Sequence, residues 1–339
     1  VQTCALPISD LALLFERTKH STDKLRYYIH LGFSEWNKNS LQPVFLFEKK
    51  LLKVLSDQYS LDSVKRVEKI FSKPPNIDTY IRNSVRKENY FEKFKGSSVS
   101  TSHFRFSKNV SLIETKGYRS GEWWVQSLAA SLPVKIAPMD FKGKYVLDVC
   151  CAPGGKSFQL ADQGAILTSI DKSEKRLKLM KENLDRLKYD LELICTDVLQ
   201  YKPKKLFDII LLDPPCTATG TLGKNPDLQF LNPLDKLEEL LDTQKKMLDL
   251  CSGWLKDNGF IIYSVCSLQK EEGENQINLF LAKHDKFRAV KPKGGPHLYK
   301  DGFEIGKDRG IRIMPFFEER IGGTEGFYFA YLQLKGKNN

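Results

Sequence analysis

The chain has 339 residues, of which 41% are hydrophobic and 28% are charged, a composition typical of a globular protein of about two domains. With 53 Lys and Arg against 42 Asp and Glu, its formal charge is +11 and its pI is about 9.1, which favours a polyanionic partner such as a nucleic acid. Its apolar runs are strand-sized and its seven cysteines include no CxxC pair, so we expect free thiols, no metal site, no membrane span and a cytoplasmic location.

Residues 1–75 are predicted to form a helical region. Apolar side chains recur there at helical spacing without a hairpin signal between them: Leu11, Leu14 and Phe15, then Leu51, Leu52, Val54 and Leu55. The KPPN sequence at residues 73–76 interrupts this pattern, because proline disfavours helix at its own position and at the preceding residue. We therefore expect a linker at this point.

Residues 76–135 are predicted to form a small α/β accessory module. The runs DTYIRN at 78–83 and NVSLIET at 109–115 have a strand-like composition. A Ser- and Thr-rich stretch at 97–102 indicates a loop. Together these features predict a sheet-containing module rather than an extension of the helical region.

One segment of this module, TKGYRSGEWWVQS, combines basic and aromatic side chains. Such a composition is suited to stacking on unpaired bases, which suggests that the module binds RNA. Packing of Trp123 and Trp124 between domains explains the same composition equally well.

Strands and helices alternate in the third part of the chain, residues 136–339, which we predict to be the catalytic domain. Strands are expected at residues 144–150, 165–171, 191–197, 207–213 and 260–266, and helices from near Ser157, at 173–187 and at 234–255. This alternation predicts an α/β fold with a mostly parallel, Rossmann-like sheet and helices on both faces. Ligands of such sheets bind at the carboxyl ends of the strands.

Three features at predicted strand ends indicate a nucleoside cofactor. The loop in DVCCAPGGKS contains Gly154 and Gly155, which allow backbone N–H groups to approach a ligand closely. Its spacing matches neither the dinucleotide fingerprint nor the phosphate loop. Asp171 ends the next strand, where an acidic residue can bind a ribose diol, and Asp197 ends the strand after that, within reach of an adenine. Each aspartate alone is equally well explained as a helix cap.

Two cysteines follow predicted strands at the same sheet edge. Asp213 and Cys216 lie at the end of one strand, and Cys266 lies at the end of another. A thiolate that adds to carbon 6 of a pyrimidine makes carbon 5 nucleophilic enough to attack a methyl sulfonium. No metal-ligand spacing accounts for these thiols, although two unrelated buried cysteines remain the simpler alternative.

Three strings in the chain resemble the RNA cytosine-5 methyltransferases of the Nol1/Nop2/Sun family: LDVCCAPGGKS, LLDPPCTATGTLGKNPD and YSVCSLQKEEGENQI. The resemblance extends over about residues 76–336. It implies a Rossmann-like methyltransferase fold, S-adenosylmethionine as cofactor and 5-methylcytosine in RNA as product. The ATGT and KNPD sequences are similar to the bacterial ribosomal RNA members, which implies 16S ribosomal RNA as substrate. Residues 1–75 would then be a shortened remnant of a NusB-like domain.

The resemblance also implies a role for each motif residue. The positions expected to bind the cofactor are Cys150, Cys151, Ala152, Pro153, Gly154, Gly155, Lys156, Asp171, Asp197 and Asp213. Cys266 would attack carbon 6, and Cys216 would help to remove the proton from carbon 5 and to release the enzyme. Asp213 would also bind the edge of the cytosine, and Lys156 would favour the thiolate.

At two of the positions where the chain departs from the family, the resemblance assigns no role to the residue. Ser127 stands where the family usually has Asp, and Glu325 stands where DGF is common. The first departure puts a contact to RNA or cofactor at Ser127 in doubt, whereas the second conserves the charge.

Several alternatives fit parts of the sequence. The expected RNA is folded but locally unpaired at the target cytosine, because the base must leave its stack to reach a thiol. Transfer RNA is an alternative substrate, and a monomer is the expected state. An amino-methyltransferase also uses an Asp-Pro-Pro strand end, but it has no use for Cys266. A non-catalytic RNA-binding or ribosome-assembly protein would have no need to retain Asp213, Cys216 and Cys266.

Overall fold

Two helices, α3 (Lys49–Gln58) and α4 (Leu61–Phe71), begin the part of the chain that the computed structural model describes. That part comprises residues 47–73, 75–85, 96–106, 111–294 and 301–336, so the predicted helix around Leu11, Leu14 and Phe15 lies outside it. The Ser60 side chain accepts a hydrogen bond from Ser63 N and caps α4. Both helices pack their apolar faces on a cluster that includes Leu222, Leu268, Met314 and Phe316. The helical region therefore packs against loops of the predicted catalytic domain, residues 136–339.

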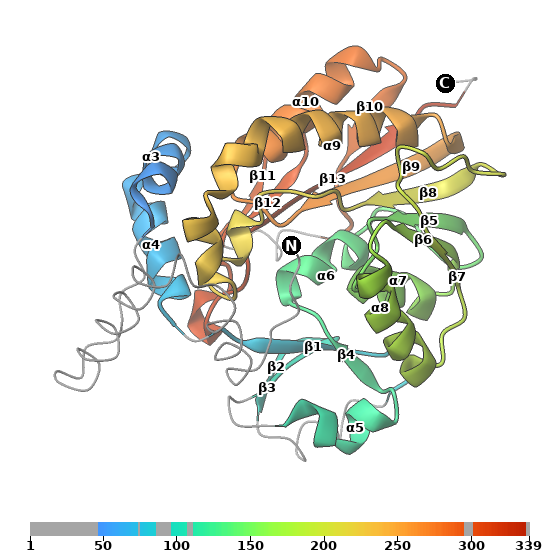
Figure 1. Cartoon of the computed structure of the whole chain (residues 1–339), viewed down its shortest axis with the longest axis horizontal. Helices are drawn as coiled ribbons and strands as arrows, with labels where there is room; N and C mark the ends of the chain where they lie inside the picture. The colour runs from blue at the N-terminus through green and yellow to red at the C-terminus, as the bar shows by residue number, and fades with distance from the viewer. Residues whose placement is uncertain (1–46, 74, 86–95, 107–110, 295–300, 337–339) are drawn as a thin grey trace.

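A four-stranded antiparallel sheet forms the accessory module (Figure 1). Its order is β2 (Gly96–Ser100), β3 (His103–Phe106), β1 (Ile77–Ile81) and β4 (Trp123–Val125). Strand β1 confirms the prediction for DTYIRN.

Two predictions within this module are wrong. Residues 97–102 were expected to be a loop, but β2 pairs with β3, whose aromatic side chains supply the packing that serines lack. The described part of NVSLIET is a 3-10 turn at Leu112–Glu114, followed by the short helix α5 (Lys116–Arg119), which Thr115 caps. Local capping therefore overrides strand propensity there.

Trp123 and Trp124 are buried, with exposed fractions of 0% and 1%. The Trp124 ring stacks on Tyr80 with a centroid separation of 4.7 Å, and its edge contacts Phe158 at 5.8 Å. Phe158 lies in the helix Gly155–Asp162, which belongs to the part of the chain with the large sheet. This tryptophan therefore joins the small sheet to that part. Packing between domains is therefore confirmed for Trp124, whereas Trp123 packs inside the module against Phe106 and Tyr118. The burial of both rings leaves neither face open for stacking on a base.

The large sheet has a parallel half that matches the predicted alternation. Its strands, in spatial order, are β7 (Glu192–Cys195), β6 (Ile166–Asp171), β5 (Tyr145–Val149), β8 (Phe207–Leu212) and β9 (Leu255–Val265). The helices between them are α7 (Gly155–Asp162), α8 (Glu174–Leu187) and α9 (Leu237–Ser252). All four pairings among these strands are parallel. This half confirms the α/β, Rossmann-like prediction.

An antiparallel half, which the sequence pattern did not predict, extends the sheet beyond β9. Strand β13 (Phe327–Leu334) pairs with β9, with β12 (Ile311–Ile313) and with β10 (Phe287–Val290), and β12 pairs with β11 (Phe303–Ile305). Strand β9 also begins earlier than expected, at Leu255, because Leu255 pairs with Phe207 before a register shift, in which Asn258 adopts a positive φ of 63°. Helix α9 starts at Leu237 because Pro233–Lys236 form a 3-10 turn.

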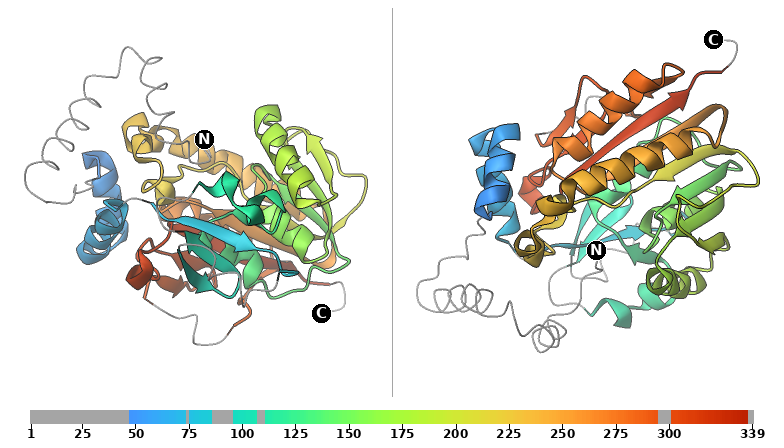
Figure 2. Two further views of the ribbon diagram at one scale, coloured as in Figure 1. Left: turned by 90° about the horizontal axis from the view of Figure 1, so that it is seen from below. Right: turned by 45° about the horizontal axis from the view of Figure 1, so that its top comes forward.

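Alternating residues of the central strands face two separate cores. Ile209 and Leu211 of β8 pack in the core that includes α6 (Leu128–Lys135), while Ile210 and Leu212 pack in the core that includes α9 and α10 (Glu274–Lys283). Figures 1 and 2 show α9 and α10 over one face of the sheet and α6 and α7 over the other. Helices on both faces were predicted. None of the helices in the described residues is long and apolar enough to cross a membrane.

Candidate active site

The two predicted thiols meet at the carboxyl edge of neighbouring parallel strands. Leu212 of β8 is in register with Tyr263 of β9, so the segments that follow both strands leave the sheet at the same edge. This geometry places Cys216 Sγ 3.6 Å from Cys266 Sγ. Cys266 is 4% exposed, and both sulfurs are free thiols. The sheet therefore brings together a thiol pair that the sequence places 50 residues apart.

A buried carboxylate holds the segment that carries Cys216. Glu272 accepts hydrogen bonds from the backbone N–H of Thr217 at 2.9 Å, from its hydroxyl at 2.5 Å and from Gln244 Nε2 at 3.0 Å. Glu272 itself is 0% exposed. Sequence reasoning missed this residue, although the two glutamates five and six residues after Cys266, to which the motif assigns no role, were a usable signal. Its role is to fix the Cys216 loop against the segment after β9.

A second brace joins the same loop to strand β13. Gly220 N donates to the carbonyl of Cys266 at 3.0 Å, and Gly326 N donates to the carbonyl of Gly220 at 2.8 Å. A Cβ atom at Gly220 would lie 2.0 Å from Gly326 O, closer than real contacts permit. Glycine is therefore required here by close backbone approach.

Lys156 and Asp213 form an ion pair whose charges act on the thiols, with Nζ and Oδ2 separated by 2.7 Å. Burial lowers the pKa of Lys156, but the charges of Asp213 and then Cys266 raise it, and the net result is above the ordinary value. Lys156 therefore stays a cation and is near enough to stabilise a Cys266 thiolate. Asp213 Oδ1 is buried and has no hydrogen-bond partner within the described residues. That oxygen is an acceptor available to a ligand.

The two thiols are not equivalent. The hydrogen bond with Cys266, together with burial, raises the pKa of Cys216 well above its ordinary value. Cys216 thus holds its proton at neutral pH and can donate it toward the Cys266 sulfur. An arrangement with a protonated thiol on one side and a lysine cation on the other favours Cys266 as the nucleophile of the pair.

The predicted cofactor loop contains a backbone conformation that glycine adopts readily and other residues rarely adopt. Gly154 has a φ of 108°, and a Cβ there would lie 2.5 Å from the Phe158 ring. Helix α7 begins at the next residue, Gly155, so its free N–H groups face the carboxyl edge of the sheet. Burial raises the pKa values of Cys150 and Cys151, which keeps both thiols protonated. These two cysteines shape the loop that continues through Ala152, Pro153 and Lys156 and offer no thiolate.

The two acidic residues at the ends of β6 and β7 already have protein partners. Asp171 accepts hydrogen bonds from the Arg176 guanidinium at 2.8 and 2.9 Å, from Ala152 N at 3.2 Å and from Ser173 N at 2.8 Å. Asp197 accepts from Leu199 N at 2.9 Å and so stabilises the turn at residues 198–200, and the helix cap considered as the alternative is wrong because no helix begins there. A ribose at Asp171 would therefore have to share the carboxylate with Arg176.

Ser127 and Glu325, two of the positions at which the chain departs from the family, contact each other. Ser127 Oγ donates to Glu325 Oε2 at 2.6 Å and also accepts from Ala130 N at the start of α6. Glu325 Oε1 pairs with Lys224 Nζ at 2.5 Å. Ser127 therefore holds an acidic side chain in place rather than supplying one.

Asp148, at the end of β5, gives the site a testable pH dependence. Burial raises its pKa to about 7, although the hydrogen bond from Ser157 and the charge of Lys156 oppose the shift. An unfolded aspartate has a pKa near 4, so the native state holds an extra proton between about pH 4 and pH 7. The stability that this proton provides is present at low pH and is lost as the pH rises toward 7.

We expect Asp148→Asn to remove this dependence. Between pH 5 and pH 8 the free energy of unfolding of the variant should rise by about 3 kcal/mol relative to the parent, because about two pH units of the shift fall in that interval. Urea unfolding at the two pH values measures the difference. Asp257→Asn, at an exposed position of β9, is the control and should run parallel to the parent. An equal difference between parent and Asp148→Asn at both pH values would contradict the assignment.

The fold and the thiol-bearing edge define a class of protein. A parallel half-sheet with a glycine loop at its carboxyl edge and an antiparallel extension is the Rossmann-like architecture of S-adenosylmethionine-dependent methyltransferases. Within that class, the family model described as 16S rRNA methyltransferase RsmB/F matches residues 136–333. The chain belongs to this family.

Curated relatives carry a corresponding name. The chain is 33% identical over 276 residues to ribosomal RNA small subunit methyltransferase B of Pseudomonas syringae, a match that covers 76% of this chain and 59% of that protein. It is 30% identical over 295 residues to the protein of the same name from Vibrio cholerae, covering 83% of this chain and 64% of the relative. The chain thus spans less than two thirds of the length of these relatives.

Solved structures share the fold. NSun6 from Pyrococcus horikoshii, solved with SFG, superposes with a TM-score of 0.73 at 18% identity, over 86% of this chain and 99% of that one. A methyltransferase homolog protein from the same organism gives a TM-score of 0.67 at 22% identity, over 85% and 99% of the two chains. At these identities the likeness concerns the fold.

S-adenosylmethionine is the cofactor of this class, and the residues at the sheet edge fit it. The start of α7 presents free N–H groups, and Asp213 Oδ1 offers an unused acceptor. Asp171 fits less directly because Arg176 occupies its carboxylate. Within the described residues, no three side chains of the types that bind metals gather in one place.

Proposed function

We propose that this chain transfers the methyl group of S-adenosylmethionine to carbon 5 of a cytosine in RNA, with Cys266 as the covalent nucleophile. The observation that carries the proposal is the Cys216–Cys266 pair, with sulfurs 3.6 Å apart, together with the Lys156–Asp213 ion pair whose charges act on them. The family supports RNA methylation, and the paired thiols at one strand edge support the choice of carbon 5. An amino-methyltransferase would have no use for a second thiol.

In the proposed reaction, Cys266 first releases its proton to solvent, and the thiolate then adds to carbon 6 of the cytosine and forms a carbon–sulfur bond. The electron pair displaced from the 5,6 double bond makes carbon 5 nucleophilic, and Asp213 Oδ1 can accept a hydrogen bond from the cytosine edge. When bound, S-adenosylmethionine supplies an electrophilic methyl group to carbon 5. Removal of the proton from carbon 5 then restores the double bond and expels Cys266 as a thiolate.

Cys216 can change its acidity during this sequence. Its high pKa depends first on the hydrogen bond with Cys266 and also on burial and on the charge of Cys266. Once the Cys266 sulfur is bonded to carbon, it can no longer become an anion, so its contribution to the pKa of Cys216 disappears. Cys216 can then release its proton to solvent, and the resulting thiolate takes up the proton of carbon 5.

The proposed cofactor site comprises Cys150 to Lys156 with Asp171, Asp197 and Asp213 at the neighbouring strand ends. The proposed substrate is small-subunit ribosomal RNA, the molecule named for the relatives, with the target cytosine unpaired. A formal charge of +11 supports a polyanionic substrate. The accessory sheet, fixed to α7 through Trp124, would contribute to the RNA surface.

The test is transfer of labelled methyl to unmodified small-subunit ribosomal RNA, with digestion to nucleosides and identification of the labelled base. We expect the label in 5-methylcytosine and none in adenine. Transfer RNA serves as the comparison substrate and should acquire less label. Label in an exocyclic amino group would instead identify an amino-methyltransferase. Tight RNA binding without S-adenosylmethionine binding in calorimetry would identify a non-catalytic binder.

A further inference from the structure

The backbone that carries Cys266 leaves the sheet at this residue. Val265 is the last residue of β9 that pairs with β13, so the ladder does not hold the residues that follow. The carbonyl of Cys266 accepts a hydrogen bond from Gly220 N at 3.0 Å, and Leu268 N donates to Thr219 Oγ1 at 3.0 Å. The orientation of the nucleophile therefore depends on hydrogen bonds from outside its own strand.

The helical region reaches the same segment through the junction between α3 and α4. Tyr59 Oη donates a hydrogen bond to the carbonyl of Leu268 at 2.6 Å. The neighbouring Gln58 accepts at Oε1 from Lys270 N at 2.8 Å, and its Nε2 donates to the Glu271 carboxylate at 2.9 Å. Two consecutive residues of the junction thus hold the segment that follows the nucleophile.

The Tyr59 hydroxyl keeps its proton at neutral pH and serves as a donor. Burial raises the pKa of Tyr59 to about 12, although the charge of Arg312 opposes the shift. The acceptor belongs to Leu268, which is 1% exposed, so water replaces this hydrogen bond poorly. Removal of one oxygen atom from Tyr59 would therefore release the backbone two residues after Cys266.

The same two helices also contact the loop that carries the other thiol. Leu222, six residues after Cys216, and Leu268, two residues after Cys266, pack in one cluster with apolar side chains of α3 and α4. Leu222 is 0% exposed. One apolar cluster therefore holds both thiol-bearing segments against the helical region.

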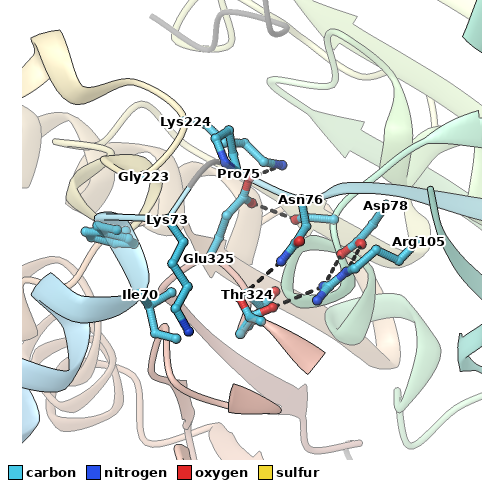
Figure 3. A pocket seen from close by; sticks show the side chains of 15 residues that line it. Ile70, Lys73, Pro75, Asn76, Asp78, Arg105, Gly223, Lys224, Thr324 and Glu325 are labelled. Carbon is cyan, nitrogen blue, oxygen red and sulfur yellow. Dashed lines mark hydrogen bonds and ion pairs between the residues drawn. The ribbon is translucent and has the colours of Figure 1, made fainter. Parts of the chain in front are cut away.

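Helix α4 and the linker that follows it are fixed to the segment that precedes β13. Arg66 Nη2 pairs with Glu319 Oε2 at 2.9 Å, and Asn76 Nδ2 donates to the carbonyl of Gly322 at 3.0 Å. Figure 3 shows Asn76 and Ile70 beside the small cleft at this end of α4, which both side chains line. The helical region is thus anchored on both sides of the junction, so the junction can hold the nucleophile's segment in one place.

We propose that Tyr59 is a positioning residue for Cys266, through which the helical region contributes to the chemical step. The inference rests on the proposed function, since it concerns the attack of the Cys266 sulfur on carbon 6. Tyr59 acts through the carbonyl of Leu268 and not by contact with the cytosine. Attack requires the reacting atoms to lie about 3 to 3.5 Å apart with their orbitals aligned, so a small displacement of the sulfur lowers the rate.

The experiment compares Tyr59→Phe with the parent and with Tyr145→Phe. Phenylalanine keeps the ring that packs in the apolar cluster and removes only the hydroxyl. Tyr145→Phe makes the same change at a partly exposed position at the start of β5, the end of the strand away from the thiols. Methyl transfer to small-subunit ribosomal RNA is followed in a single turnover with saturating RNA and S-adenosylmethionine, and urea unfolding verifies that each variant is folded under the assay conditions.

We expect the saturated rate of Tyr59→Phe to be about tenfold lower than that of the parent, because the sulfur is less well aligned for attack. The KM for RNA and the Kd for S-adenosylmethionine should stay within about twofold of the parent values, since a positioning residue affects the chemical step and not binding. Tyr145→Phe should match the parent in all three quantities.

A role of Tyr59 in stability alone would change the urea midpoint and leave the saturated rate of the folded enzyme unchanged, and that result would overturn the proposal. A change confined to the KM for RNA or to the Kd for S-adenosylmethionine would overturn it as well. The proposed function fails separately: it is refuted if the parent forms no 5-methylcytosine, whereas equal saturated rates of 5-methylcytosine formation by the parent and Tyr59→Phe refute only the role of Tyr59.

Discussion

Replacement of Cys266 by alanine is expected to abolish methyl transfer, with kcat reduced by about 10,000-fold or more, as is typical when a covalent nucleophile is removed. The reason is that carbon 5 of cytosine becomes nucleophilic only after addition at carbon 6, and the described site offers one thiol with a neighbouring cation for that addition. Labelled-methyl transfer to small-subunit ribosomal RNA measures the loss.

Two controls separate chemistry from folding in this experiment. Cys251→Ala removes another buried sulfur, in α9 and away from the sheet edge, and should retain nearly all of the activity. Affinity for S-adenosylmethionine in calorimetry should be the same in Cys266→Ala and in the parent. Methylation of cytosine at the parental rate by Cys266→Ala would show that the covalent mechanism is wrong.

The parallel half of the sheet was predictable because its strands are short, continuous apolar runs bounded by turn signals. The runs IILL of β8 and IIY of β9 are buried on both faces, which produces a continuous apolar pattern. Parallel strands end at one edge, so the meeting of Cys216 and Cys266 follows once both are placed just after such strands. The 3.6 Å separation of their sulfurs is a finding of the structure alone.

The antiparallel half could not be read in the same way. Strands β11 and β12 have three residues each, too few to establish a period. The same difficulty arises in the accessory sheet. Strand β2 there consists of glycine, serines and one valine, and its hydrogen bonds to β3 hold it in place rather than its own strand propensity. In each case a long-range pairing determines the structure.

The residues that hold the reacting groups in position could not be predicted from the sequence either. Glu272 acts on Thr217, which lies 55 residues away, so its role depends on the tertiary fold. The same holds for Gly220, whose need for a hydrogen side chain arises from the approach of Gly326. The motifs identified the reacting groups, whereas the groups that position them had no local pattern.

Cys216→Ala is expected to trap the enzyme on its RNA. If Cys216 is the base that removes the proton from carbon 5, the variant still forms the Cys266–carbon bond but resolves it slowly. Turnover should fall by about 100-fold to 10,000-fold, the usual contribution of a general base. A protein–RNA adduct that survives denaturing electrophoresis should accumulate with Cys216→Ala and be barely detectable with the parent.

The adduct distinguishes a catalytic role of Cys216 from a structural one. Cys216→Ala leaves intact the Glu272 hydrogen bonds to Thr217, so the loop retains its anchor. The double variant Cys216→Ala/Cys266→Ala should form no adduct, because the bond to RNA requires the Cys266 sulfur. Slow turnover of Cys216→Ala without any adduct would assign Cys216 to positioning of Cys266 through their contact, and adduct formation by the double variant would place the covalent bond at another residue.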